Sequence, residues 1–210
     1  MAKIIQFPLN PEPEKFGLQR ARKKKTNDDG KPAQLNLFTA GKVIRLNQLS
    51  VFEEALLMDE QGQSGKARVY YQKAIAEDDC AADAYCNLGI IESQEGNYPK
   101  AIDCFTLCLK LNPRHYEAHY NLANLYFDQN DFQLAQLHFQ MATELEPEFA
   151  NAYFNLALVL SINSHAEAAS QALAKYRTLV PAEEARDAAR LLEDLKKSIS
   201  TAKNSRLNSA

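Results

Sequence analysis

Two pairs of metal-ligating residues stand four positions apart in the sequence. His115 and His119 form one pair, and Cys104 and Cys108 form the other. Side chains at i and i+4 lie on the same face of a helix, so either pair could share a zinc ion with further ligands. We favour a structural role, because His119 and Cys108 stand at positions that packing residues occupy elsewhere in the chain. The sequence therefore predicts no metal ion and no cofactor.

Motifs for catalysis are missing from the sequence. It contains neither a glycine-rich phosphate loop nor a nucleophile elbow, and no paired carboxylates lie near a base. We therefore expect no catalytic residues and no enzyme activity.

Three asparagines, Asn87, Asn121 and Asn155, recur at intervals of 34 residues. A carboxamide offers a donor and an acceptor together, which match the C=O and N–H groups of a peptide backbone. If the three carboxamides lie at the same height in successive units, they would form a ladder that binds the backbone of a peptide. The alternative is that each asparagine bonds the neighbouring helix, and the sequence leaves both interpretations open.

The 34-residue period extends through the middle of the chain. Each unit has a small residue followed four positions later by a large one, and three units end in proline, where a helix should stop. The small residues are Ala67, Ala101, Ala135 and Ala169, the large ones are Tyr71, Phe105, Phe139 and Leu173, and the prolines are Pro113, Pro147 and Pro181. This pattern predicts two antiparallel helices per unit, at about 48–81, 82–115, 116–149 and 150–183.

The first helix of each unit carries a second recurring set of residues. The set is Tyr85, Asn87, Leu88 and Gly89, then His119, Asn121, Leu122 and Ala123, then Tyr153, Asn155, Leu156 and Ala157. Over roughly residues 48–181 the chain resembles the tetratricopeptide repeat family. The resemblance implies an all-α helical solenoid of about four helix pairs, a scaffold that binds a protein or peptide partner.

The resemblance also implies that the first helices line a concave groove. The candidate peptide-binding residues are Phe52, Asn87, Ile90, Tyr120, Asn121, Asn124, Phe127, Phe154, Asn155 and Leu158. Family members that bind chaperone tails hold the terminal carboxylate with lysines, an arginine and asparagines. The comparable positions here are apolar or acidic, such as Leu56 and Asp83. We therefore expect no binding of chaperone tails through such a clamp.

The segments outside the repeats differ in charge from the repeats themselves. Residues 1–47 carry a net charge of +6, residues 48–181 a charge of −10, and the rest +1. We expect 1–47 to be a mostly disordered basic tail, able to fold onto the groove or to bind nucleic acid weakly. After Pro181, helical spacing predicts a capping helix over 184–199 and a flexible end over 200–210. Short apolar runs and the lack of an export signal predict a cytoplasmic protein without membrane contact.

A short motif in the basic tail supports an alternative function. Gln34, Leu35, Asn36, Leu37 and Phe38 resemble the pentapeptide with which bacterial translesion polymerases and repair proteins dock on the DNA sliding clamp. The alternative is an accessory factor of DNA replication or repair that is tethered to the clamp by residues 34–38.

A peptide of residues 31–41 should bind purified sliding clamp with micromolar affinity. Burial of Leu35, Leu37 and Phe38 contributes about 1.5 to 3 kcal/mol each, while ordering five residues costs about 1 to 2 kcal/mol apiece. Calorimetry should detect this binding, and the double change Leu37→Ala with Phe38→Ala should abolish it. No heat at high micromolar concentration would remove the replication hypothesis.

Overall fold

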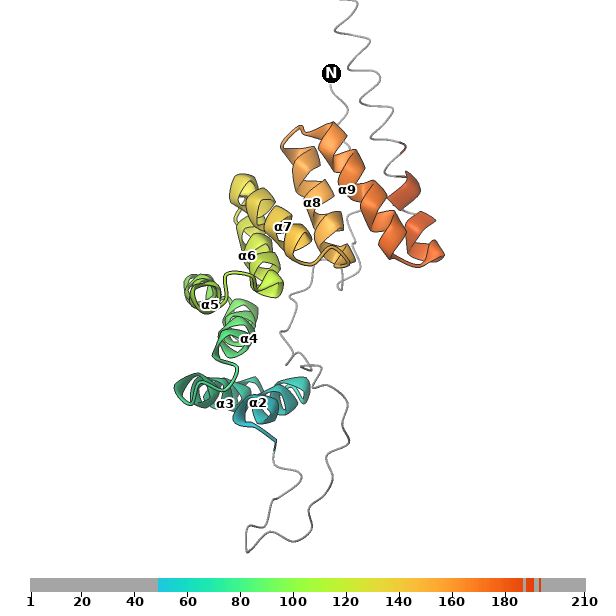
Figure 1. Ribbon diagram of the computed structural model, residues 1–210. Helices are drawn as coiled ribbons and strands as arrows, with labels where there is room; N and C mark the ends of the chain where they lie inside the picture. Colours follow the sequence, from blue (N-terminus) through green and yellow to red (C-terminus); the bar gives the residue numbers. More distant parts are fainter. Residues whose placement is uncertain (1–48, 187, 191–192, 194–210) are drawn as a thin grey trace, which may run out of the picture.

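The computed structural model describes residues 49–186, 188–190 and 193 (Figure 1). The basic tail, the 34–38 motif and the 200–210 segment lie outside these described residues. The predicted all-α fold is confirmed, and helices α2 to α9 follow in chain order within the described residues. They are α2 (Val51–Glu60), α3 (Ser64–Ala76), α4 (Ala81–Gln94), α5 (Tyr98–Leu111), α6 (Tyr116–Asp128), α7 (Phe132–Leu145), α8 (Ala150–Ile162) and α9 (Ala166–Leu179).

The helices pack as four consecutive pairs. Within each pair the two helices contact each other, and the second helix of one pair packs on the first helix of the next. The pairs follow one another along an open arc with α2 and α3 at one end and α8 and α9 at the other (Figure 1). Helix α4 also contacts α6. We call α2, α4, α6 and α8 the first-helix layer and α3, α5, α7 and α9 the second-helix layer.

The small and large residues of the period meet inside each pair. All four alanines of the small set are fully buried, and the large residues four positions on are at most 1% exposed. Alanine lets two helix backbones approach closely, and the ring or leucine side chain fills the space beside the crossing. Burying each large side chain stabilises the fold by about 1.5 to 3 kcal/mol.

Left-handed residues make the turns inside the pairs. Gly62, Gly96 and Asn130 have φ angles of 72°, 79° and 61°, as their positions in the sequence predict, and Ser164 takes the same place in the fourth pair with φ 63°. Glycine and asparagine adopt this conformation at low cost.

The first pair ends without proline. Asp78 has a φ of 55° and Cys80 a φ of 53°, so two left-handed residues turn the chain from α3 into α4. The Phe52 N–H donates to Asp79 Oδ2 at 2.8 Å. The carboxylate that stands in place of a proline therefore ties this turn to the start of α2.

Helical backbone continues after Pro181. Residues 182–186 and 188–190 are helical, Ala188 is 1% exposed within the core of the last two pairs, and the Tyr176 hydroxyl donates to Glu184 Oε2 at 3.1 Å. This segment covers the end of the fourth pair, and most of 191–199 lies outside the described residues. None of the helices in the described part of the chain is long and apolar enough to span a membrane.

A pair of histidines joins α6 to α7. His119 Nδ1 lies 3.0 Å from His138 Nδ1, and His119 Nε2 lies 3.3 Å from the Pro113 carbonyl oxygen. The carbonyl can only accept, so His119 Nε2 carries the proton and its Nδ1 accepts from His138. The His138 ring also stacks on Tyr126. Both imidazole rings are thus neutral, and one proton lies in the hydrogen bond between them.

Gly89→Ala should destabilise the fold. An added Cβ would lie 2.8 Å from Cε1 of Phe105, whose fully buried ring has no room to move. We expect the free energy of unfolding to fall by about 1 to 3 kcal/mol in urea titrations. The matched control is Gly65→Ala in α3, where nothing lies within 4 Å of the new Cβ. That change should be neutral or stabilise by up to about 1 kcal/mol, and equal effects of the two changes would contradict this packing.

The histidine pair should make stability fall as the solution turns acidic. Burial lowers the pKa of His119, and burial together with His119 lowers the pKa of His138 to about 4. The unfolded histidines have pKa values of about 6.5, so the unfolded state takes up protons more readily below that pH. The contribution of this pair to the free energy of unfolding should therefore be constant above about pH 6.5 and decrease between about 6.5 and 4. His138→Phe should flatten this decrease, whereas His165→Gln, at an exposed position, should leave it unchanged.

Candidate functional site on the first-helix layer

The ten predicted groove residues lie on the first-helix layer, and the structure buries nearly all of them. Phe127 is half-buried and the other nine are at most 9% exposed. They are Phe52, Asn87, Ile90, Tyr120, Asn121, Asn124, Phe154, Asn155 and Leu158. Because so little of each side chain is exposed, any part in recognition depends on a few polar atoms and on the charged residues around them.

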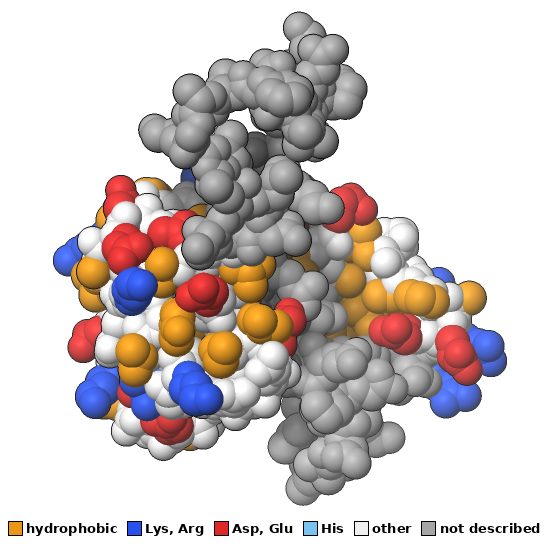
Figure 2. All heavy atoms as spheres, turned by 90° about the horizontal axis from the view of Figure 1, so that it is seen from below, with side chains coloured by type: hydrophobic (Ala, Val, Ile, Leu, Met, Phe, Trp, Pro, Cys, Tyr) orange, Lys and Arg blue, Asp and Glu red, His pale blue; other side chains and the backbone are white. Residues whose placement is uncertain are grey.

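The charges of the first-helix layer are all of one sign. Its four helices contain Glu53, Glu54, Asp59, Glu60, Asp83, Glu92, Glu117 and Asp128, and they contain no lysine or arginine. Basic residues occur instead on the second-helix layer, for example Lys66 and Arg68 on α3. Seen from below, the surface shows acidic and basic side chains interspersed with hydrophobic ones (Figure 2). The first helices α2, α4 and α6 are therefore acidic, whereas α8 carries no charged residue.

Two of the three repeated asparagines link successive first helices. Asn155 Nδ2 on α8 donates to the Tyr120 hydroxyl and to Asn124 Oδ1 on α6, both at 3.1 Å. Asn121 Nδ2 on α6 approaches Cys86 Sγ on α4 at 3.6 Å. The Asn155–Tyr120 and Asn121–Cys86 contacts each join residues that are 35 positions apart. The sequence left two interpretations open, and these amides make the interhelical bonds of one of them.

Two polar atoms of this amide cluster have no hydrogen-bond partner among the residues that the structure describes. They are Asn124 Nδ2, a donor, and Asn155 Oδ1, an acceptor, and both are buried. Leaving a buried polar group unsatisfied costs about 1 to 3 kcal/mol. A donor and an acceptor beside each other are also the complement of a peptide group.

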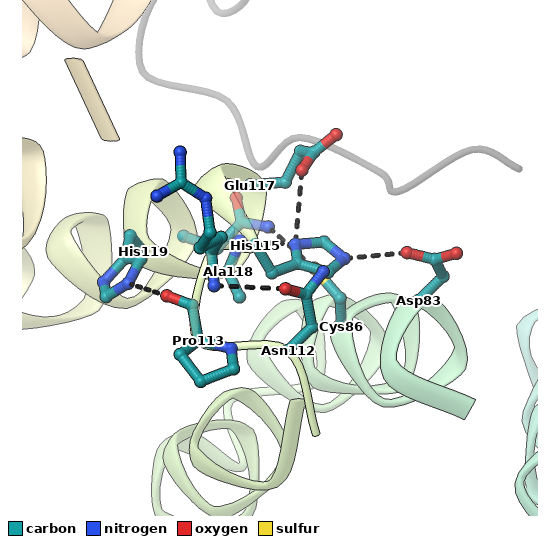
Figure 3. A network of polar contacts seen from close by, with 10 residues as sticks. Asp83, Cys86, Asn112, Pro113, His115, Glu117, Ala118 and His119 are labelled. Atoms are coloured by element: carbon teal, nitrogen blue, oxygen red, sulfur yellow. Dashed lines mark hydrogen bonds and ion pairs between the residues drawn. The ribbon is translucent and has the colours of Figure 1, made fainter. Parts of the chain in front are cut away.

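Carboxylates surround the ring of His115 at the start of α6 (Figure 3). Its Nε2 lies 2.9 Å from Asp83 Oδ1 on α4, and its Nδ1 lies 3.2 Å from Glu117 Oε2. The Ala118 N–H also points at Nδ1, at 3.2 Å. Burial alone lowers the pKa of His115, but the hydrogen bond with Asp83 and the charges of Cys86 and Glu117 outweigh it and raise the pKa overall.

The structure brings together metal-ligating residues that the sequence did not connect. The ligand atoms of Cys86, Cys108 and His115 all lie within 4.8 Å of one another. His119, the i+4 neighbour of His115, turns to His138 instead. Cys104, the i−4 neighbour of Cys108, packs against one cluster of buried core residues. Cys108 belongs to a different cluster. A spacing of four therefore does not identify the residues that the structure brings together.

Comparison with known proteins supports the repeat. The family model for the tetratricopeptide repeat matches residues 82–115 and 116–149. Tetratricopeptide repeat protein 8 of Mus musculus is 38% identical over 79 residues, and its Homo sapiens counterpart is 35% identical over 79 residues. Each match covers 38% of this chain and 15% of the relative. The chain thus spans a small part of the length of these relatives.

Solved structures share the fold. A crystal structure of MamA superposes with a TM-score of 0.56 at 19% identity, covering 75% of this chain and 99% of that chain. The first tetratricopeptide domain of Spaghetti (RPAP3), bound to the HSP90 peptide SRMEEVD, superposes with a TM-score of 0.51 at 22% identity, covering 57% and 93%.

Tetratricopeptide domains are generally protein–protein interaction modules and typically non-catalytic. The two matched segments are those that build α4 to α7, with the same paired helices continuing on both sides. Residues 82–149 therefore match the tetratricopeptide repeat, and the fold of the described chain is that of tetratricopeptide repeat structures.

Proposed function

We propose that the first-helix layer forms a groove that binds a basic segment of a partner protein. The observation that carries this proposal is the charge of the layer, which has eight acidic residues and no lysine or arginine. Uniform charge along one side of a molecule attracts oppositely charged partners and speeds their association. A partner rich in lysine or arginine fits this face, and an acidic one is repelled.

The amide cluster supports an extended peptide as the form of that segment. Asn124 Nδ2 and Asn155 Oδ1 would gain partners from one peptide group that inserts beside them. Asn155 itself is fixed by its bonds to Tyr120 and Asn124. An amide held in place in advance loses little conformational entropy on binding.

The acidic residues of the first-helix layer also distinguish this protein from a protein of the same fold that binds an acidic peptide. The peptide on the Spaghetti (RPAP3) domain, SRMEEVD, carries three acidic residues and one basic residue. Recognition of such a peptide needs cations on the binding face. The first helices of this chain offer none, which supports the expectation that chaperone-type acidic tails do not bind here.

Removing acidic groups from the first-helix layer should weaken binding of a basic peptide. We would measure fluorescence anisotropy of a labelled arginine- and lysine-rich peptide with the full chain, using Glu60→Gln with Asp128→Asn. Each lost charge pair is worth about 0.2 to 1 kcal/mol, so the dissociation constant should rise about 2- to 30-fold at low salt. High salt should reduce the difference, because it screens exposed charges.

The matched control makes the same two charge changes on the second-helix layer. Asp103→Asn with Glu144→Gln alters exposed residues of α5 and α7 and should leave the affinity nearly unchanged. Asn124→Leu, made in the wild type, removes the unsatisfied donor and also the acceptor that holds Asn155, so it should weaken binding of the peptide. If both double variants weaken binding equally, net charge alone attracts the peptide and the first-helix groove is not its site.

A further inference from the structure

Three buried ligands converge from three elements at the joint between the second and third repeats. Cys86 comes from α4, Cys108 from α5 and His115 from the start of α6. The two cysteines are fully buried and His115 is 4% exposed. Their ligand atoms lie within 4.8 Å of one another. Two thiols and an imidazole are a donor set that zinc prefers.

The same three positions are apolar in neighbouring repeats. One period later they hold Tyr120, Ala142 and Phe149, where the two rings pack edge to face at 4.8 Å. One period earlier they hold Phe52, Ala74 and Ala81, all of them buried. The fold therefore needs only apolar residues at this place. In the second repeat all three positions carry metal-ligating residues at once.

The surroundings of His115 suit a metal ligand. One ring nitrogen faces Asp83 and the other faces Glu117. When Nδ1 exchanges the bond from the Ala118 N–H for a cation, Nε2 keeps its proton and donates it to Asp83, the arrangement that orients histidine in metal sites. Asn121 Nδ2 points at Cys86 Sγ, and a nearby N–H donor stabilises a coordinated thiolate.

We propose that Cys86, Cys108 and His115 form a zinc site that fastens the second repeat to the third. In a tetrahedral zinc site, sulfur and nitrogen ligands are about 3.5 to 3.8 Å apart, so small side-chain rotations are enough to close the present arrangement. Water is the fourth ligand. Asp83 is 28% exposed and provides a path for the ion to enter from solvent.

The site acts on one joint of the array. Stability in a repeat array is approximately a sum over neighbouring interfaces, and the three ligands lie on both sides of one interface. Zinc would therefore stiffen the link between α4/α5 and α6/α7 and raise the thermal midpoint of the whole chain.

Cobalt substitution tests the proposal directly. The full chain, reduced and freed of metal by chelation, is titrated with Co²⁺ and then with Zn²⁺. We expect one equivalent of Co²⁺ to give thiolate-to-cobalt charge-transfer absorption and the intense visible bands of a tetrahedral site. Zn²⁺ should bleach these bands and raise the thermal midpoint.

Two variants separate coordination from packing. Cys108→Ala installs the residue that the first and third repeats carry at this position, so it should fold normally but bind zinc at least about 100-fold more weakly. Cys104→Ala on the same helix is the matched control and should bind as the wild type does. The triple variant Cys86→Tyr, Cys108→Ala and His115→Phe copies the third repeat and should show neither cobalt bands nor zinc stabilisation.

A separate variant tests whether Asp83 positions the ring of His115. Asp83→Asn should weaken zinc affinity by about 10- to 100-fold while keeping the cobalt spectrum tetrahedral. Absence of charge-transfer absorption in the wild type would overturn the proposal. So would bands of equal strength in the triple variant, because the ion would then sit on other residues.

Discussion

A pair of helices of 10 to 14 residues cannot bury its apolar surface within itself. Each second helix must lie against the first helix of the next pair, and this need for a neighbour determines the rest of the structure. The fully buried alanines at the crossings bring the backbones close enough for the aromatic rings to fill the remaining space. A core of three clusters that follow one another along the array results from this one requirement.

Because every repeat satisfies the same packing requirement, chemistry can change at a fixed place without changing the fold. The place occupied by Cys86 in the second repeat holds Tyr120 in the third and Phe154 in the fourth. The asparagine contact reaches that place in both cases, as Asn121 to the sulfur and Asn155 to the tyrosine hydroxyl. The repeated geometry thus presents a sulfur acceptor to the asparagine at one joint and a hydroxyl acceptor at the next.

The 34-residue period allowed the fold to be predicted, because small and large residues at a crossing are a direct consequence of helix packing. Positive-φ turns followed from Gly62, Gly96 and Asn130 in the same way. Contacts between residues of different repeats could not be predicted from the 34-residue period. Cys86, Cys108 and His115 stand 22 and 7 residues apart, and their meeting depends on how α5 and α6 cross. The histidine pair is similar, since His138 has no spacing relation to His119 that a single helix would explain. Burial of the asparagines also needed the packed array, because their helix face is polar in sequence and enclosed in the structure.

Separation of charge between the two layers has a consequence for self-association. The described first helices sum to −8, whereas the second helices sum to +4. The array therefore has an electric dipole across its thickness, perpendicular to the direction in which the repeats advance. Two copies related by a twofold axis that joins their first-helix layers would repel each other. The orientation that charge favours places the first-helix layer of one copy against the second-helix layer of the next, which is a head-to-tail contact.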